Sequence, residues 1–203
     1  MELINNRYRI LQTKYTDRLV SCYKVRDLLD NDRIYYMYIV NSQIVPQNII
    51  ERVFKRFYKY SSISHPFLVK DIELDMIYSV DRKIVKKIDY YYITEFFEYE
   101  TKYIDYAKKS SESLIEDFCD ILKIMDLIHK RGTVYEFLDE KSIYLDKAGH
   151  IKLKDIVTAF IESGTNHKTW QNDLIYKAPE LFIGDKPSIK TDIYALGAFF
   201  EII

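Results

Sequence analysis

The sequence contains little glycine, proline or cysteine: 5 Gly, 4 Pro and 2 Cys among 203 residues. A chain with so little glycine and proline is neither collagen-like nor of low complexity. Cys22 and Cys119 lie far apart in the sequence, so they form neither a disulfide framework nor a C-x-x-C motif. No run approaches the ~18 apolar residues of a membrane span, and residues 1–7 have no apolar signal segment. These absences predict a cytoplasmic protein.

An excess of one charge and a local metal-binding motif are also missing. Lys and Arg number 30 against 31 Asp and Glu, a net charge of −1, which attracts the whole chain neither to nucleic acid nor to an anionic membrane. The four histidines lie too far apart for a local metal site. We therefore predict no nucleic acid, membrane or metal ion as a partner. The chain does have 19 Tyr and 11 Phe, which supply large side chains for a core.

The first half of the sequence reads as strands with one helix. Strand patterns occupy residues 8–11, 19–25, 34–40, 69–80 and 88–95. After Pro46, apolar residues recur at helical spacing up to Phe57, and this helix should end before His65-Pro66. The sequence thus predicts five strands and one helix.

The second half has a more helical character. Ser113 and Glu116 form a capping-box pattern ahead of an apolar helical stripe that should end at Gly132. Short strands are expected over 142–145 and 150–153, and a last helix near Thr191. A composition change near residues 99–102 is the candidate boundary between the two halves.

Five segments, taken in order, carry a family resemblance. They are residues 65–69 (HPFLV), 128–132 (IHKRG), 149–155 (GHIKLKD), 176–180 (YKAPE) and 191–197 (TDIYALG). The series resembles the protein kinase family and extends over essentially the whole chain. The resemblance implies one α+β, protein-kinase-like bilobal domain: a five-stranded antiparallel N-lobe with one helix over residues 1–97, and a mainly helical C-lobe over 98–203. Because the family's C-lobe continues with further helices, we expect the lobe to be incomplete here and the chain to be the N-terminal part of a longer signalling protein.

The positions that bind phosphate in this family carry other residue types here. The glycine-rich loop matches Tyr15, Asp17 and Val20, so the glycines that allow close approach to phosphate are absent. The phosphate-binding lysine of the third strand matches Tyr38, and its glutamate partner on the helix matches Arg56. The resemblance therefore predicts that this lysine–glutamate pair does not form.

The catalytic positions differ as well. The H-R-D motif matches Tyr135, Glu136 and Phe137, and the magnesium-binding Asn matches Ser142. A phenylalanine cannot accept the proton of a hydroxyl group. Asp155, the first residue of the D-F-G segment, is the one retained nucleotide-site residue, and Asp139 should point away from the place of Phe137.

Aromatic side chains are expected to fill the nucleotide cleft. Tyr36 and Tyr38 lie two residues apart on one strand and so share a face, and Tyr144 matches the residue beneath the adenine. Tyr60, Tyr135 and Ile156 match positions that stack between the lobes. We therefore predict no cofactor, neither ATP nor Mg²⁺, and no activation-segment switch at Thr158, Ser163, Thr165 or Thr169, because Glu136 would repel a phosphate there.

These substitutions favour a non-catalytic pseudokinase that regulates a protein partner or another domain of the same chain by allosteric contact. Two alternatives remain. One is an active serine/threonine protein kinase that uses displaced residues such as Asp139 and Asp155. The other is a small-molecule sensor whose former nucleotide cleft binds a less charged ligand.

Overall fold

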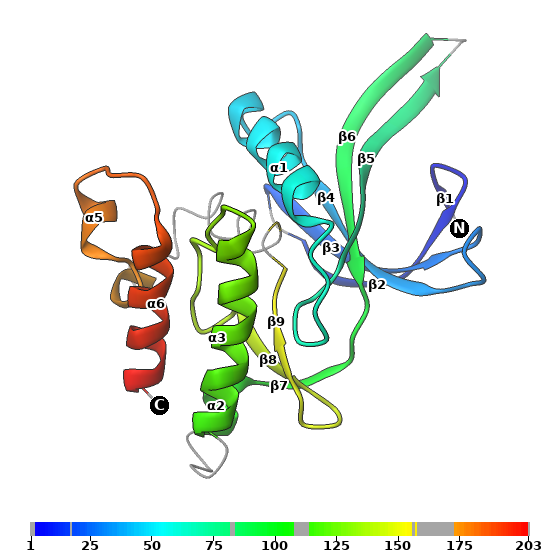
Figure 1. The fold of residues 1–203 in the computed structure, drawn as a ribbon. Coiled ribbons are helices and arrows are strands. Elements are labelled where there is room, and N and C mark those ends of the chain that lie inside the picture. Colours follow the sequence, from blue (N-terminus) through cyan, green and yellow to red (C-terminus); the bar gives the residue numbers. More distant parts are fainter. Residues whose placement is uncertain are drawn as a thin grey trace. The chain divides into compact units, whose positions relative to one another are not determined.

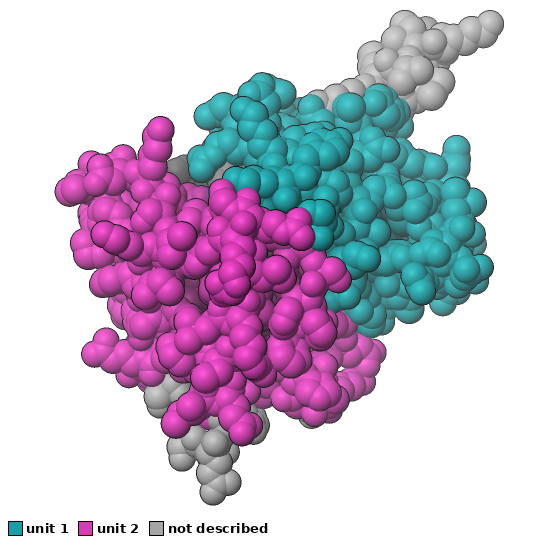
Figure 2. Space-filling view, viewed as in Figure 1, with its two compact units in different colours: residues 1–62, 70–96 teal, residues 63–69, 97–203 magenta. Residues whose placement is uncertain are grey.

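The computed structural model describes residues 3–16, 18–81, 84–107, 114–155, 157 and 173–202. The chain divides into two compact units, coloured separately in Figure 2. The first unit comprises residues 1–62 and 70–96, and the second comprises residues 63–69 and 97–203. The segment 63–69, which we had assigned to the first lobe, therefore groups with the second unit.

The first unit is built on one antiparallel sheet (Figure 1). The strand order is β1-β2-β3-β4-β6-β5, and the bounds are β1 Leu3–Ile4, β2 Tyr8–Thr16, β3 Val20–Asp27, β4 Ile34–Val40, β5 Asp71–Asp81 and β6 Ile84–Glu95. The prediction of five strands is wrong because β1 adds a sixth. Two residues are too short to show alternation, and β1 turns into β2 through Asn5 and Asn6, whose positive φ angles (50° and 55°) asparagine tolerates well.

One helix, α1 (Gln47–Tyr60), lies between β4 and β5 in the sequence and begins after Pro46, as predicted. Its apolar side chains are buried on one side, since Ile50, Val53 and Phe57 recur at helical spacing. The ring of Phe57 lies 6.0 Å from that of Tyr92 on β6, and Phe54 lies 5.1 Å from Tyr90. These aromatic contacts attach α1 to the sheet.

An arginine joins three parts of this sheet. Arg7, in the turn between β1 and β2, donates hydrogen bonds to Asp27 at the end of β3 (2.6 Å) and to Glu73 on β5 (2.8 Å). The Tyr91 hydroxyl also donates to Glu73. Burial alone would raise the pKa of Asp27, but hydrogen bonds from Arg7 and from the backbone N–H of Leu29 lower it below its ordinary value. The charge of Arg7 is therefore paired with those of Asp27 and Glu73.

The second unit is more helical. Its bounds are β7 Tyr99–Lys102, α2 Tyr103–Ala107, α3 Leu114–Lys130, β8 Ile143–Asp146, β9 Ile151–Leu153, η1 Asp173–Ile175, α5 Pro179–Phe182 and α6 Ile189–Ile202. The strands form a small antiparallel sheet in the order β7-β8-β9. The predicted helix up to Gly132 and both predicted strands are present, whereas β7 and α2 were missed. The predicted capping residue Ser113 lies outside the described residues.

Helix α6 begins two residues before the predicted Thr191. The hydroxyl of Ser188 accepts a hydrogen bond from the N–H of Lys190 (3.2 Å), and the N–H of Ser188 donates to the Thr191 hydroxyl (2.9 Å). This reciprocal cap satisfies donors that the first helical turn leaves exposed. Ser188, directly before Ile189, is a capping residue that marks this helix start, and the prediction did not use it.

Aromatic rings pack α6 against the rest of the second unit. Tyr103 of α2 stacks on Phe199 at 6.2 Å, and Phe118 of α3 meets Phe200 edge-on at 4.6 Å. Buried aliphatic side chains of α3, such as Ile121 and Met125, complete this core. Among the described residues, no helix combines the length and apolar character needed to cross a membrane.

Candidate functional site

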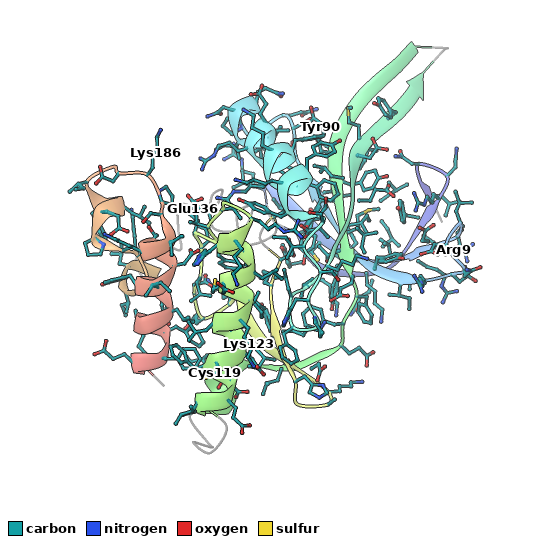
Figure 3. The ribbon with its side chains drawn as sticks, viewed as in Figure 1. Arg9, Tyr90, Cys119, Lys123, Glu136 and Lys186 are labelled. Atoms are coloured by element: carbon teal, nitrogen blue, oxygen red, sulfur yellow. The ribbon has the colours of Figure 1, made fainter. Side chains whose placement is uncertain are left out.

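A buried carboxylate organises the candidate site, which lies wholly within the second unit. Asp192 of α6 is 1% exposed. Its two oxygens accept hydrogen bonds from the backbone N–H groups of Tyr135 and Glu136, each at 2.7 Å. The Nε2 of His129, near the end of α3, lies 2.7 Å from the same carboxylate. Asp192 thus connects α3, α6 and the loop after α3, where Glu136 is labelled in Figure 3.

This loop contains a strained residue. Glu136 has a φ of 77°, in the left-handed region that residues other than glycine seldom occupy. Such a conformation costs ~1–3 kcal/mol and persists only where the surroundings hold it, most often at functional sites. Here two consecutive backbone N–H groups, those of Tyr135 and Glu136, donate hydrogen bonds to the Asp192 carboxylate and so hold this conformation.

Beyond the strained residue, the loop fixes a second carboxylate. Asp139 Oδ1 accepts hydrogen bonds from the Ser142 hydroxyl (2.7 Å) and from the backbone N–H of Lys141 (2.8 Å). The N–H of Asp139 in turn donates to Ser142 Oγ at 3.0 Å. Ser142, which matches the family's magnesium-binding Asn, is therefore engaged in orienting Asp139.

The negative charges of two carboxylates raise the pKa of one buried phenol. Tyr135 is fully buried, and its hydroxyl donates to the carbonyl of Lys154 at 3.0 Å. Burial raises the pKa of Tyr135 well above its ordinary value, and the negative charges of Asp155 and Asp139 raise it further. Asp155 is itself 2% exposed. Tyr135, Asp139, Ser142 and Asp155 consequently form one polar cluster in which the phenol keeps its proton.

A pocket opens beside this cluster. Its volume is about 280 Å³, and it is lined by Glu136, Phe137, Leu138, Asp139, Leu174, Tyr176, Lys177, Leu181, Asp185 and Pro187. Most of these side chains are apolar. Phe137 and Asp139 both line this pocket. That Asp139 points away from the place of Phe137 stays a prediction.

The tyrosines predicted to fill the cleft are buried within the first unit. Tyr36 and Tyr38 of β4 are 6% and 8% exposed. The ring of Tyr36 lies 5.0 Å from Phe96, and that of Tyr38 lies 5.9 Å from Tyr92. Their predicted effect on nucleotide binding stays a prediction.

Tyr144 lies in the other unit, on β8. Its ring is 6.2 Å from that of Phe97, and the Lys154 ammonium lies 5.5 Å from the ring centroid. The predicted role of Tyr144 in filling the nucleotide cleft stays a prediction too. Asp17, Ile156, Thr158, Ser163, Thr165 and Thr169, which carried further predictions, lie outside the described residues.

Arg56 lies on α1, among other basic residues of that helix. No role was predicted for His129, nor was the contact of Asp192 with the residues at the H-R-D position. Those contacts span 63 and 56 residues of sequence. No local pattern signals a contact over such a distance.

Comparison with known proteins supports the protein kinase superfamily. The chain is 23% identical over its whole length to the "Probable serine/threonine-protein kinase PknB" of Lactococcus lactis, of which it covers 32%. It is 25% identical to the serine/threonine-protein kinase sck2 of Schizosaccharomyces pombe (83% of this chain, 26% of that protein) and 27% identical to kin-29 of Caenorhabditis elegans (70% and 17%). The chain thus spans about a third or less of the length of these relatives. No protein-family model matches it.

These relatives overturn the main functional prediction. All of them are named as serine/threonine protein kinases, so the prediction of a non-catalytic pseudokinase is contradicted, and the alternative of an active kinase has the better support. The antiparallel sheet with one helix fits the α+β N-lobe of that family. Our prediction weighed the residues at the motif positions one by one.

Proposed function

We propose that the chain is part of a serine/threonine protein kinase that uses Asp139, instead of the residue at the H-R-D aspartate position, to receive the proton of the acceptor hydroxyl. The observation that carries this proposal is the strained loop: Asp192 holds Glu136 at a φ of 77°, and Asp139 follows at the edge of a pocket. Strain maintained by buried hydrogen bonds is typical of a site that needs a fixed geometry.

Asp139 has the chemistry of a general base. Hydrogen bonds from Ser142 and Lys141 fix Oδ1, and a positioned carboxylate can accept a hydroxyl proton during transfer. In the proposed reaction the acceptor oxygen forms a bond to the γ-phosphorus of ATP. The bond from that phosphorus to the bridging oxygen breaks, ADP leaves, and the proton passes to Asp139. Ser142 is then a positioning residue.

The pocket suits a polypeptide acceptor. Its lining is mostly apolar, and it borders both Asp139 and Phe137. An apolar side chain next to the acceptor serine or threonine would bury surface there and orient the hydroxyl towards the carboxylate. This supports a protein as the phosphate acceptor, in place of the regulatory protein partner that the sequence predicted.

A divalent cation would be held by Asp155. The donor set is suitable, because Mg²⁺ is usually bound by one or two carboxylates together with substrate phosphates. When bound, Mg²⁺ neutralises charge on the transferring phosphoryl group. The negative charge of Asp155 helps to keep the buried Tyr135 phenol protonated, and the phenol hydroxyl donates a hydrogen bond to the Lys154 carbonyl. The phenol thus adds no negative charge to the cluster.

Transfer of radiolabelled phosphate from ATP tests the proposal. The purified protein is incubated with γ-³²P-ATP, Mg²⁺ or Mn²⁺, and mixed serine- and threonine-containing peptides. We expect phosphate incorporation, reduced about 100-fold or more in Asp139→Asn, because general-base catalysis contributes on the order of 10²–10⁴ in rate. The matched control is Glu140→Gln, which removes a neighbouring charge outside the pocket lining and should leave the rate within about twofold.

Two results would contradict the proposal. One is absence of incorporation by the wild-type protein with either metal. The other is an Asp139→Asn variant as active as Glu140→Gln. Incorporation would in turn overturn our prediction that the protein uses no nucleotide.

A further inference from the structure

Strands β5 and β6 extend beyond the other strands of the first unit. Among the described residues, β4 pairs with β6 over Tyr90–Glu95 and no further, whereas the pairing of β5 with β6 continues past Tyr90 to the far ends of both strands. Residues 77–81 and 84–89 therefore form a two-stranded ribbon, which projects past β4 in Figure 1 and begins next to Tyr90, labelled in Figure 3. We name this ribbon the β5–β6 arm.

One edge of the β5–β6 arm is open. In the part of the chain that the structure describes, no strand pairs with Ile84–Asp89 on the side of β6 away from β5. In an antiparallel ribbon, alternate residues direct both their N–H and their C=O away from the partner strand. This stretch therefore offers a row of backbone donors and acceptors to a further strand. A ribbon of two strands gains stability when a third strand joins it.

The open edge carries an excess of positive charge. Lys86 and Lys87 lie within this stretch of β6, and residues 82–83, between the two strands, are Arg and Lys. The one anion of the stretch is Asp89, whose carboxylate accepts a hydrogen bond from the N–H of Ser42 at 2.8 Å. The whole chain has a net charge of −1, so this excess is local.

The charges of the two strands select the kind of partner. β5 is acidic, so its outer edge would repel an acidic segment; its acidic residues are Asp71, Glu73, Asp75 and Asp81. Lysines on the β6 edge oppose pairing with the same edge of a second copy, because like charges would meet across the strands. An acidic strand would bring opposite charges together at these positions. Nucleic acid fits less well, since a phosphodiester chain lacks the alternating amide groups that pair with a backbone edge.

We propose that the open edge of β6 binds an acidic, extended segment of a protein partner, which adds to the β5–β6 arm as a third strand. In this mode of recognition, backbone hydrogen bonds supply affinity and side chains supply specificity. Here the lysines of β6 would attract the acidic side chains, and this attraction weakens as salt screens the charges. The inference does not rest on the proposed kinase reaction, because the arm lies in the first unit and Asp139 lies in the second.

Peptide binding without ATP or metal tests this inference, so its outcome is separate from that of the kinase assay. The probe is a fluorescent library of peptides ~8 residues long, in which Glu alternates with Val, Ile, Thr or Tyr. The comparison library has Lys in place of every Glu. We expect the acidic library to bind about tenfold more tightly or better at low salt, because opposite charges across paired strands attract and like charges repel. Fluorescence anisotropy measures both affinities.

A backbone change separates strand addition from attraction by charge alone. Methylating every backbone nitrogen of the acidic peptides removes their N–H donors and leaves their charge unchanged. We expect the methylated library to bind about tenfold more weakly or worse, because a third strand would lose its hydrogen bonds to β6. Hydrogen exchange locates the contact: the unmodified acidic library should slow the exchange of the amides of residues 84–89.

Paired variants test the role of the lysines. Lys86→Glu/Lys87→Glu should weaken binding of the acidic library about tenfold or more, and the milder Lys86→Gln/Lys87→Gln should act in the same direction. The matched control is Lys55→Glu/Lys70→Glu, which makes the same change of charge at two exposed lysines of the same unit outside the arm. It should leave the affinity within about twofold.

Several outcomes would overturn the proposal. Absence of binding by the acidic library, or equal binding of the acidic and basic libraries, would remove the role of charge complementarity. Equal binding of the methylated library would exclude strand addition. Equal loss of binding in the control and arm variants would show attraction by general charge alone. Slower exchange of residues 84–89 with rising protein concentration, in the absence of peptide, would assign the edge to a second copy, and displacement of the acidic library by low concentrations of a DNA duplex would assign it to nucleic acid.

Discussion

Charged side chains have different structural roles in the two units. In the first unit, Arg7 pairs with Asp27 and Glu73, and these opposite charges join a turn to two strands. In the second unit, Asp192 accepts hydrogen bonds from the backbone N–H groups of Tyr135 and Glu136. The first arrangement supports a regular sheet, whereas the second maintains an irregular loop. The difference teaches that a buried carboxylate can either join strands by pairing with a cation or hold a positive φ angle by accepting backbone hydrogen bonds.

Removing the charge of Asp192 should have the largest effect. In Asp192→Asn, one carboxylate oxygen becomes an amide nitrogen that faces an N–H donor, so a buried hydrogen bond is lost. We expect the free energy of unfolding to fall by about 3 kcal/mol, because hydrogen bonds to charged groups contribute ~1.5–3 kcal/mol and the group left buried adds a penalty. Urea unfolding followed by circular dichroism measures this. The exposed Asp185→Asn serves as the control, and similar effects in both variants would mean that Asp192 does not hold the loop.

Asp27→Asn should have the next largest effect, and the effect should depend on pH. The folded pKa of Asp27 lies below its ordinary value, so the carboxylate stabilises the fold above the unfolded pKa of about 3.9 and loses this contribution as pH falls through the folded pKa. At pH 7 we expect a loss of about 2 kcal/mol. Below pH ~4 the variant should approach the wild type.

Urea unfolding at several pH values measures this difference. The control is Asp32→Asn, an exposed position of the same unit whose positive φ (59°) asparagine also tolerates. A difference between Asp27→Asn and wild type that stays constant from pH 7 to pH 3 would contradict a role for the carboxylate charge.

Glu136→Gly should give the smallest change, and in the opposite direction. Glycine adopts a positive φ without strain, so the variant should raise the free energy of unfolding by about 1 kcal/mol. Glu140 lies in the same loop and is not one of the described residues with a positive φ angle. Glu140→Gly should therefore lower the free energy of unfolding. Thermal unfolding of both variants tests the contrast. A Glu136→Gly variant destabilised as much as Glu140→Gly would contradict the strain at Glu136.

Local sequence patterns predicted much of the secondary structure. The spacing of Ile50, Val53 and Phe57 predicted α1, because apolar residues at helical spacing are buried on one face of a helix. Strand-forming residues between turn signals predicted β3 to β6 to within four residues, whereas β2 extends five residues beyond its predicted end at residue 11. The two-residue β1 was missed because two residues cannot show a period, and β7 was missed because residues 99–102 were interpreted as the boundary between the two halves. The resemblance to protein kinases came from ordered motifs, and the relatives support it.

The candidate site was predicted only in part. Asp139 and Asp155 were recognised as available carboxylates, but the sequence could not show that Ser142 orients Asp139 or that Asp139 lines a pocket. Residue types at the motif positions led to the prediction of a pseudokinase, which the named relatives contradict.

The sequence by itself therefore determined most of the helices and strands, the family resemblance, and which carboxylate and basic side chains the protein has. It did so because burial and helical or strand spacing are local properties of the chain. Only the tertiary structure decided that Asp192 holds Glu136 in a strained conformation, because that contact joins residues 56 positions apart. The positive φ of Glu136 depends on this distant carboxylate. The residues next to Glu136 in the sequence do not specify it.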